Sequence, residues 1–355
     1  MYDLKDLLQR SIEENASDVH FTVGRPPCYR IDGVLNAIEG ERLMPDTLEE
    51  LLLPIMEERH REELKRDGQT DFAYAIAGVG RFRVNVFRQR GTLASVMRCL
   101  PFEIPEPENL GIPKEVVDIT NRKRGLVLVT GPTGSGKSTT LASLLHVINQ
   151  SYPYHIITLE DPIEYLHQHD KSIVNQREIG SDSESYGAAL RAALREDPDV
   201  ILVGEMRNLE TISTAITAAE TGHLVFSTLH TIGADKTIDR IIDVFPPDQQ
   251  QQVRIQLASV LECVISQQLL PKADGHGRRA ALEILFANPA VRNLIRENKS
   301  FQITSFMQTG RKYGMQTMDD AIYDLFLGRE VDAETAISYA QDPVAMTEKV
   351  DFKEF

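Results

Sequence analysis

The chain has 355 residues, which is too many for one ordinary domain and enough for two. Apolar residues make up 42% and charged residues 26%, as in ordinary globular domains, and no apolar run has the length of a membrane span. The net charge of −15 argues against a nucleic-acid partner, and three widely spaced cysteines argue against a disulfide framework or a zinc site.

The pattern of apolar residues and turn signals in the first hundred residues predicts a small α/β domain. Residues 3–15 fit an amphipathic helix without the basic and apolar regions of a signal peptide, so we expect a cytoplasmic protein. Asp32-Gly33 is a strong hairpin signal, and residues 45–66 fit one or two helices. Strands are predicted at 19–23, 29–31, 70–77, 81–89 and 92–100.

A segment rich in proline and glutamate follows at 101–113. This composition predicts a stiff, solvated linker, and therefore two domains that move against each other. We expect an N-terminal domain at 1–100 and a C-terminal domain at 114–355.

The C-terminal domain shows alternating strand and helix patterns, which predict a parallel sheet wound with helices. Its strands are expected at 126–130, 156–159, 200–203 and 224–228. A hairpin with its turn at 274–277 comes next, and residues 288–355 are expected to be mostly helical.

The strongest motif follows the first of these strands and fits the phosphate-binding pattern of Gly, four residues, Gly, Lys, and Ser or Thr. Its glycines let several N–H groups point at one place, and the helix that starts at Ser138 adds partial positive charge there. Lys137 is expected to reach the β- and γ-phosphates of ATP, and the Ser138 hydroxyl to hold Mg²⁺. The predicted nucleotide-binding residues are Gly131, Pro132, Thr133, Gly134, Ser135, Gly136, Lys137, Ser138 and Thr139.

Carboxylates follow two further strands, where open α/β sheets place their ligands. Glu160 and Glu164 stand just past the strand at 156–159, and a carboxylate there can orient a water and accept its proton. An acidic loop that caps a helix is the alternative. Glu205 ends the strand at 200–203 as a Walker B acid does, and is expected to hold Mg²⁺ directly or through water. A Gly-Glu ending in place of Asp is unusual among ATPases.

Two histidines flank the strand at 224–228. His230 lies at the carboxyl end of this strand and is expected to sense the γ-phosphate or the water. His223 lies at the opposite end, where a structural role fits as well as a functional one. Because the two are at opposite ends of a strand, they are not expected to bind one metal ion together.

Arginines gather on one face of the N-terminal strands. Alternation along residues 81–86 puts Phe82 on one face and Arg83 on the other, and Arg98 lies near the end of the next strand. A solvated face is one interpretation. The other is that a hinged domain brings these arginines to the phosphates, as arginine fingers do.

Five ordered motifs together resemble the secretion ATPase superfamily. They are residues 16–21, the phosphate-binding loop, the acidic segment 160–164, residues 190–207, and the pair His223 and His230. Within this superfamily the chain is most similar to type IV pilus retraction ATPases of the PilT type. It lacks the extra N-terminal domain and the four-cysteine module of assembly ATPases, and residues 290–297 resemble the AIRNLIRE motif linked with retraction. Val291 replaces the usual Ile of that motif, and Asn208 stands where Asp is common.

The resemblance implies a PAS-like N-terminal domain, a RecA-like P-loop NTPase domain with a helical C-terminal extension, and a homohexameric ring. It implies ATP between the two domains, a peripheral position at the inner-membrane base of the pilus machine, and a platform protein of that membrane as partner. By position it assigns Glu160 or Glu164 to the water and Glu205 to Mg²⁺. It also assigns His230 to the γ-phosphate, and Arg83 and Arg98 to contacts with phosphate from the N-terminal domain.

A retraction motor is therefore the leading hypothesis. The alternatives are a pilus assembly or type II secretion ATPase, a DNA-translocating RecA-like ATPase, and an ATP-gated scaffold. The acidic charge counts against DNA, and the full set of carboxylates counts against a scaffold. The helix at 290–297 has its own alternative, in which Val291 and Ile295 pack in a core and Arg292 and Arg296 form an exposed face.

Overall fold

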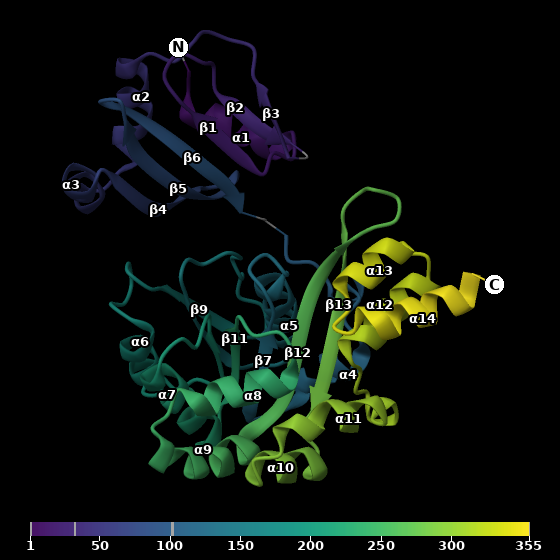
Figure 1. Ribbon diagram of the computed structural model, residues 1–355. Coiled ribbons are helices and arrows are strands. Elements are labelled where there is room, and N and C mark those ends of the chain that lie inside the picture. The colour runs from purple at the N-terminus through teal and green to yellow at the C-terminus, as the bar shows by residue number, and fades with distance from the viewer. Residues whose placement is uncertain (1, 32, 101–102, 355) are drawn as a thin grey trace. The chain divides into compact units, whose positions relative to one another are not determined.

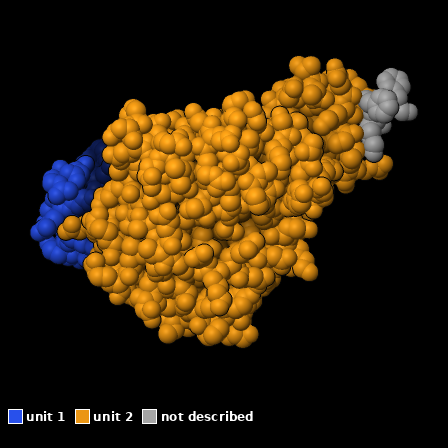
Figure 2. Space-filling view, turned by 90° about the horizontal axis from the view of Figure 1, so that it is seen from below, with its two compact units in different colours: residues 1–103 blue, residues 104–355 orange. Residues whose placement is uncertain are grey.

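The computed structural model describes residues 2–31, 33–100 and 103–354, which form a mixed α/β fold of the predicted class (Figure 1). Contacts divide the chain into two compact units, Met1–Glu103 and Ile104–Phe355, which Figure 2 colours separately. Each unit has hydrophobic core clusters of its own.

The first unit is an antiparallel sheet with helices on its apolar face. Its strand order is β3-β2-β1-β6-β5-β4. Alternation along β5 buries Phe82, Val84 and Val86 completely, in one core cluster with the apolar residues of the helices, and leaves Arg83 exposed. The elements are α1 (Leu4–Glu13), β1 (Asp18–Phe21), β2 (Cys28–Ile31), β3 (Val34–Ala37), α2 (Pro45–Leu52), η1 (Leu53–Ile55), α3 (Glu58–Asp67), β4 (Gln69–Ile76), β5 (Gly80–Gln89) and β6 (Thr92–Leu100).

The second unit is built on a seven-stranded sheet of order β13-β12-β7-β11-β10-β8-β9. All neighbours are parallel except the edge strand β13, which runs antiparallel to β12. The strands are β7 (Gly125–Thr130), β8 (His155–Glu160), β9 (Ile173–Glu178), β10 (Val200–Val203), β11 (Leu224–Leu229), β12 (Leu261–Pro271) and β13 (Arg278–Phe286). Because β7, β8, β10 and β11 are parallel neighbours or near neighbours, the loops after them meet at one edge of the sheet.

Helices cover both faces of this sheet, and each central strand is therefore buried on both sides. Leu126 and Leu128 belong to one core cluster, and Val127 and Val129 to another. The α-helices are α4 (Lys114–Val117), α5 (Lys137–Ser151), α6 (Tyr186–Ala193), α7 (Leu209–Glu220), α8 (Ala234–Asp243), α9 (Pro247–Val260), α10 (Pro289–Arg296), α11 (Ile303–Gln308), α12 (Met318–Leu327), α13 (Ala333–Tyr339) and α14 (Pro343–Glu354). Short 3-10 helices are η2 (Pro107–Leu110), η3 (Asp118–Asn121), η4 (Ser300–Gln302) and η5 (Arg311–Tyr313).

The proline-rich segment differs from the solvated linker predicted at 101–113. Residues 101 and 102 lie outside the described residues. Pro107 is buried within η2, and Ile112 is buried in the same core cluster as Leu145 of α5. Prolines and glutamates favour a solvated linker, but the apolar side chain of Ile112 is stabilised by burial in this core. Residues 107–112 therefore pack as part of the second unit.

Candidate functional site

The phosphate-binding loop connects β7 to α5 and is shaped by three glycines. Gly131, Gly134 and Gly136 have φ values of 138°, 78° and 88°, a region that side chains with a Cβ rarely adopt. A Cβ at Gly131 would lie 2.2 Å from the carbonyl oxygen of Gln267 on β12, so this position has no room for one. The loop therefore lies close against the neighbouring strand.

Lys137 and Ser138 begin α5 directly after the loop. The Lys137 ammonium donates to the carbonyls of Gly131 and Pro132, both at 2.9 Å, and burial lowers its pKa even though Glu205 and Glu164 lie near enough to raise it. Thr139 shares a hydrogen bond of 2.9 Å with the hydroxyl of Tyr165. These contacts fix the start of α5, where N–H groups without helical partners can bind an anion.

Glu160, the last residue of β8, is an enclosed carboxylate. Thr158 donates to it at 2.6 Å and Gln176 of β9 at 3.2 Å, and the backbone N–H of Glu164 also donates to it. Burial outweighs these bonds and raises the pKa of Glu160 to about 7. Glu164 itself is exposed, and no hydrogen bond or ion pair given for the described residues involves its carboxylate. Glu160 thus fixes the backbone that carries Glu164.

Glu205 follows β10 and is held by the side chains of Arg207 and His230. Arg207 Nη2 lies 2.7 Å from one carboxylate oxygen, and His230 Nε2 lies 3.1 Å from the other. Burial alone would raise the pKa of Glu205, but Arg207 and His230 outweigh it and lower the pKa below its usual value. The group is therefore a carboxylate at neutral pH.

The position of His230 depends on the strands around it. Thr228 on β11 donates to the carbonyl of Gly204 at 2.6 Å, which joins the ends of β10 and β11. Beyond His230, the N–H of Gly233 donates to Ser266 at 3.1 Å and that of Ala234 to Glu283 at 2.7 Å. Ser266 and Glu283 are paired across β12 and β13, so the edge hairpin anchors the turn after His230.

These side chains meet at an open cavity of about 560 Å³ at the carboxyl ends of the strands. Lys137, Ser138 and Thr139 lie on one side of it, and the cavity is also lined by Glu160, Asp161, Glu164, Tyr186, Glu205, Arg207, His230 and Arg278. A cavity with both cations and carboxylates beside a phosphate-binding loop suits a nucleotide with a divalent cation and a water.

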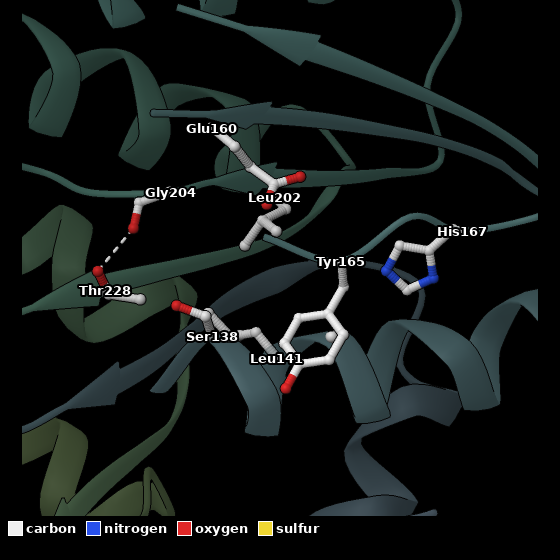
Figure 3. A pocket seen from close by; sticks show the side chains of 9 residues that line it. Ser138, Leu141, Glu160, Tyr165, His167, Leu202, Gly204 and Thr228 are labelled. Atoms are coloured by element: carbon white, nitrogen blue, oxygen red, sulfur yellow. Dashed lines mark hydrogen bonds between the residues drawn. The ribbon is translucent and has the colours of Figure 1, made fainter. Parts of the chain in front are cut away.

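A second, smaller cavity of about 40 Å³ lies behind Ser138 (Figure 3). Ser138, Glu160 and Thr228 line this space, and Figure 3 shows the rings of Tyr165 and His167 on the side away from Thr228. Its volume is enough for a water molecule, and it has hydroxyl and carboxyl groups in its lining to bind one.

The structure thus brings together the phosphate-binding loop, Glu160, Glu164, Glu205 and His230. It places His223 at the other end of β11, where its ring contacts the carbonyl of Ala218 at 2.9 Å. Arg83 and Arg98 lie in the first unit, paired in register on β5 and β6, and Arg98 donates to Asp18 at 3.1 Å. Their contact with phosphate stays a prediction.

Tyr186, Arg207 and Arg278 line the cavity and are among the lining residues for which the sequence predicted no role. Arg207 belongs to a recognised motif but was given no role, and Tyr186 and Arg278 gave no signal. Burial and the charges of Asp161 and Glu205 raise the pKa of Tyr186, so its hydroxyl stays protonated and able to donate.

The comparisons with known proteins agree with this geometry. Residues 2–330 match the protein family described as type II/IV secretion system protein. The chain is 48% identical over 341 residues to the type IV pilus retraction ATPase PilT of Pseudomonas aeruginosa, covering 96% of this chain and 99% of that protein. It is 46% identical to a twitching motility protein of Neisseria gonorrhoeae, covering 98% of this chain and 92% of that one. A crystal structure of the pilus retraction motor PilT with bound ADP superposes with a TM-score of 0.92 at 53% identity, covering 97% of this chain and 99% of that chain.

Proposed function

The chain belongs to the type II/IV secretion system protein family, and we propose that it is an ATPase motor that powers retraction of type IV pili. The observation that carries this proposal is the cavity in which Lys137 and Ser138 face Glu164, Glu205 and His230. It is supported by identity of 48% to a retraction ATPase over nearly the whole of both chains.

ATP is held by the loop, whose N–H groups and Lys137 bind the phosphates. Mg²⁺ fits the site, because the Ser138 hydroxyl and the Glu205 carboxylate are the hard oxygen ligands that it prefers. No three His, Cys, Asp or Glu of the described residues form a cluster that would hold a metal by itself, which suits an ion held jointly by the protein and phosphates. When bound, Mg²⁺ neutralises charge on the β- and γ-phosphates.

Glu164 orients the attacking water and accepts its proton, and Glu160 is its positioning residue. Glu160 already accepts three hydrogen bonds, one of them from the backbone of Glu164, whereas the carboxylate of Glu164 faces the cavity. His230 senses the γ-phosphate and, through Glu205, the state of the metal site. Arg83 and Arg98 add positive charge from the first unit, as arginine fingers do.

The motor works as a homohexamer at the inner-membrane base of the pilus machine, where it acts on a platform protein. This assembly rests on the membership of the family and on the resemblance of its motifs. Among the described residues, no helix combines the length and the apolar character needed to cross a bilayer.

The ATPase part of the proposal is tested with the purified chain. Lys137→Ala, Glu164→Gln and Glu205→Gln should each lower turnover by roughly 100-fold or more, and the two Gln variants should still bind ATP. Turnover at the native rate in either Glu variant would contradict its role. Strong stimulation of the native rate by DNA would favour a nucleic-acid translocase instead.

The cellular part is tested by deleting the gene and counting surface pili and their shortening events. Abundant long pili that do not shorten would support retraction. Bald cells would point to pilus assembly and overturn the proposal.

A further inference from the structure

Gln267 is a polar side chain buried in an apolar strand next to the phosphate-binding loop. It lies on β12, which runs parallel to β7, and only 3% of its surface is exposed. Its strand neighbours Ile265 and Leu270 are fully buried apolar residues. A buried amide is costly unless its N–H and C=O groups are bonded, so its partners show what it does.

Both ends of the Gln267 amide are bonded to residues that flank Lys137. Its Nε2 donates to the carbonyl of Ser135 at 2.6 Å, and its Oε1 accepts from the hydroxyl of Thr140 at 2.7 Å. A Cβ added at Gly136 would lie 2.7 Å from Nε2. One side chain therefore joins the end of the loop to the first turn of α5.

The bond to Ser135 determines where the next N–H points. The carbonyl of Ser135 and the N–H of Gly136 share one trans peptide plane and point in opposite directions. Because Gln267 holds the carbonyl toward β12, the N–H of Gly136 is turned away from that strand, and Gly136 lines the large cavity.

We infer that Gln267 is a positioning residue for phosphate binding, which holds the Ser135–Gly136 peptide in the orientation that offers its N–H to a nucleotide phosphate. This inference rests on the proposed use of the loop for ATP. Glutamate at this position would place a carboxylate oxygen against the Ser135 carbonyl, and the repulsion would favour a flipped peptide.

The test compares Gln267→Glu and Gln267→Met with the matched controls Gln268→Glu and Gln268→Met. Gln268 is the next residue on the same strand, points to the other face, and has no side-chain hydrogen bond among those given for the described residues. Affinity for ADP and ATP with Mg²⁺ is measured by calorimetry, beside the melting temperature. At about pH 8.5 we expect Gln267→Glu to weaken ADP binding roughly 10-fold or more, and the controls to change it less than about twofold.

The pH dependence separates positioning from general loss of structure. A protonated glutamic acid can donate to the Ser135 carbonyl, so the ADP affinity of Gln267→Glu should approach the native value as the pH falls toward 6, whereas that of Gln267→Met should not. Native-like ADP affinity in both folded Gln267 variants, or an equal loss in the Gln268 controls, would overturn the inference. So would a lowered melting temperature with unchanged affinity.

If the Gln267 variants do not fold, Thr140→Val and Thr140→Ser replace them. Thr140→Val should weaken ADP binding by a smaller factor and Thr140→Ser should restore it, and native affinity in Thr140→Val would overturn the inference. A native chain that binds ADP but does not turn over ATP would contradict the motor and leave this test intact. A native chain that binds neither ADP nor ATP would overturn both the proposed motor function and the inference about Gln267.

Discussion

Three glutamates at the site differ in what surrounds them, and this difference between single residues supports the roles that we propose for them. Glu205 is paired with Arg207 and His230, Glu160 is an enclosed acceptor of three hydrogen bonds, and Glu164 faces the cavity. A carboxylate that stays ionised offers the hard oxygen ligand that Mg²⁺ prefers, and an uncommitted carboxylate can accept a proton from a water.

Arg207 keeps Glu205 ionised, and its removal should change the pH profile of the enzyme. Without Arg207 the burial of Glu205 is opposed by His230 alone, so the pKa of Glu205 rises. We expect the acid limb of kcat/KM in Arg207→Ala to move to higher pH, and Arg207→Lys to keep it near the native position. An unmoved acid limb in Arg207→Ala would show that Glu205 does not control that limb.

Glu160 should make the folded state less stable as the pH rises. Its pKa is about 7 when folded and near 4.5 when unfolded, so the unfolded state loses its proton first and is favoured between these two values. The free energy of unfolding of the native chain, relative to that of Glu160→Gln, should therefore fall by about 3 kcal/mol from below pH 4.5 to above pH 7. Urea unfolding of both proteins across this range measures the difference. A constant difference would mean that the group is not enclosed.

At the scale of elements, α10 shows that a motif residue can have a structural role. The alternative interpretation of this motif placed Arg292 on an exposed face, but its side chain is only 21% exposed. Its guanidinium donates to the carbonyls of Ala258 and Ser259 at 2.7 and 2.8 Å and to Glu262 at 2.8 Å, so it caps the end of α9. Val291 and Ile295 are fully buried, as expected.

Arg292→Ala should therefore destabilise the fold, by about 2 kcal/mol, because it leaves partly buried acceptors without donors. Arg296→Ala is the control, since Arg296 is exposed at the end of the same helix. Thermal unfolding of both variants measures the cost. If Arg292→Ala abolished pilus shortening while the stability of the variant stayed native, Arg292 would bind another component of the pilus machine instead of stabilising the end of α9.

Most helices and strands could be predicted from where their apolar residues stand. Apolar residues recur about every 3.6 positions in the helices, alternate in the half-buried strands, and form short continuous runs in the buried strands. The strands of the parallel sheet at β7, β8, β10 and β11 are short apolar runs, and they lie within a residue or two of the predicted bounds. The edge strand β9 was missed, because it is mostly polar and Ile173 is exposed. A polar edge strand is defined by its hydrogen bonds to β8, which the sequence alone does not show.

The residues of the site also fall into two groups, those that the sequence could predict and those that it could not. Lys137, Ser138 and the glutamates stand in motifs with fixed spacing, so the sequence could name them. The roles of Arg207 and Gln267 depend on contacts between strands that are distant in the chain, β10 with β11 and β12 with β7. The signal for Gln267 in the sequence is the run of three polar residues, Ser266-Gln267-Gln268, inside the otherwise mostly apolar strand at 261–271.

At the scale of the whole molecule, two compact units and one nucleotide site suit a protein that converts binding energy into movement. The acidic net charge of −15 predicts that DNA will not stimulate turnover, which distinguishes this chain from RecA-like translocases. Its similarity to a retraction ATPase extends over 96% of the chain, so the comparison covers both units.

We propose that hydrolysis of ATP bound at Lys137 powers pilus shortening. The most direct measurement of this role replaces the native gene with one that encodes Lys137→Ala and follows fluorescently labelled pili on living cells. We predict normal levels of the variant protein, long and numerous pili, and a loss of nearly all shortening events. Shortening at the native frequency, or cells without pili, would contradict a role of this ATPase in retraction.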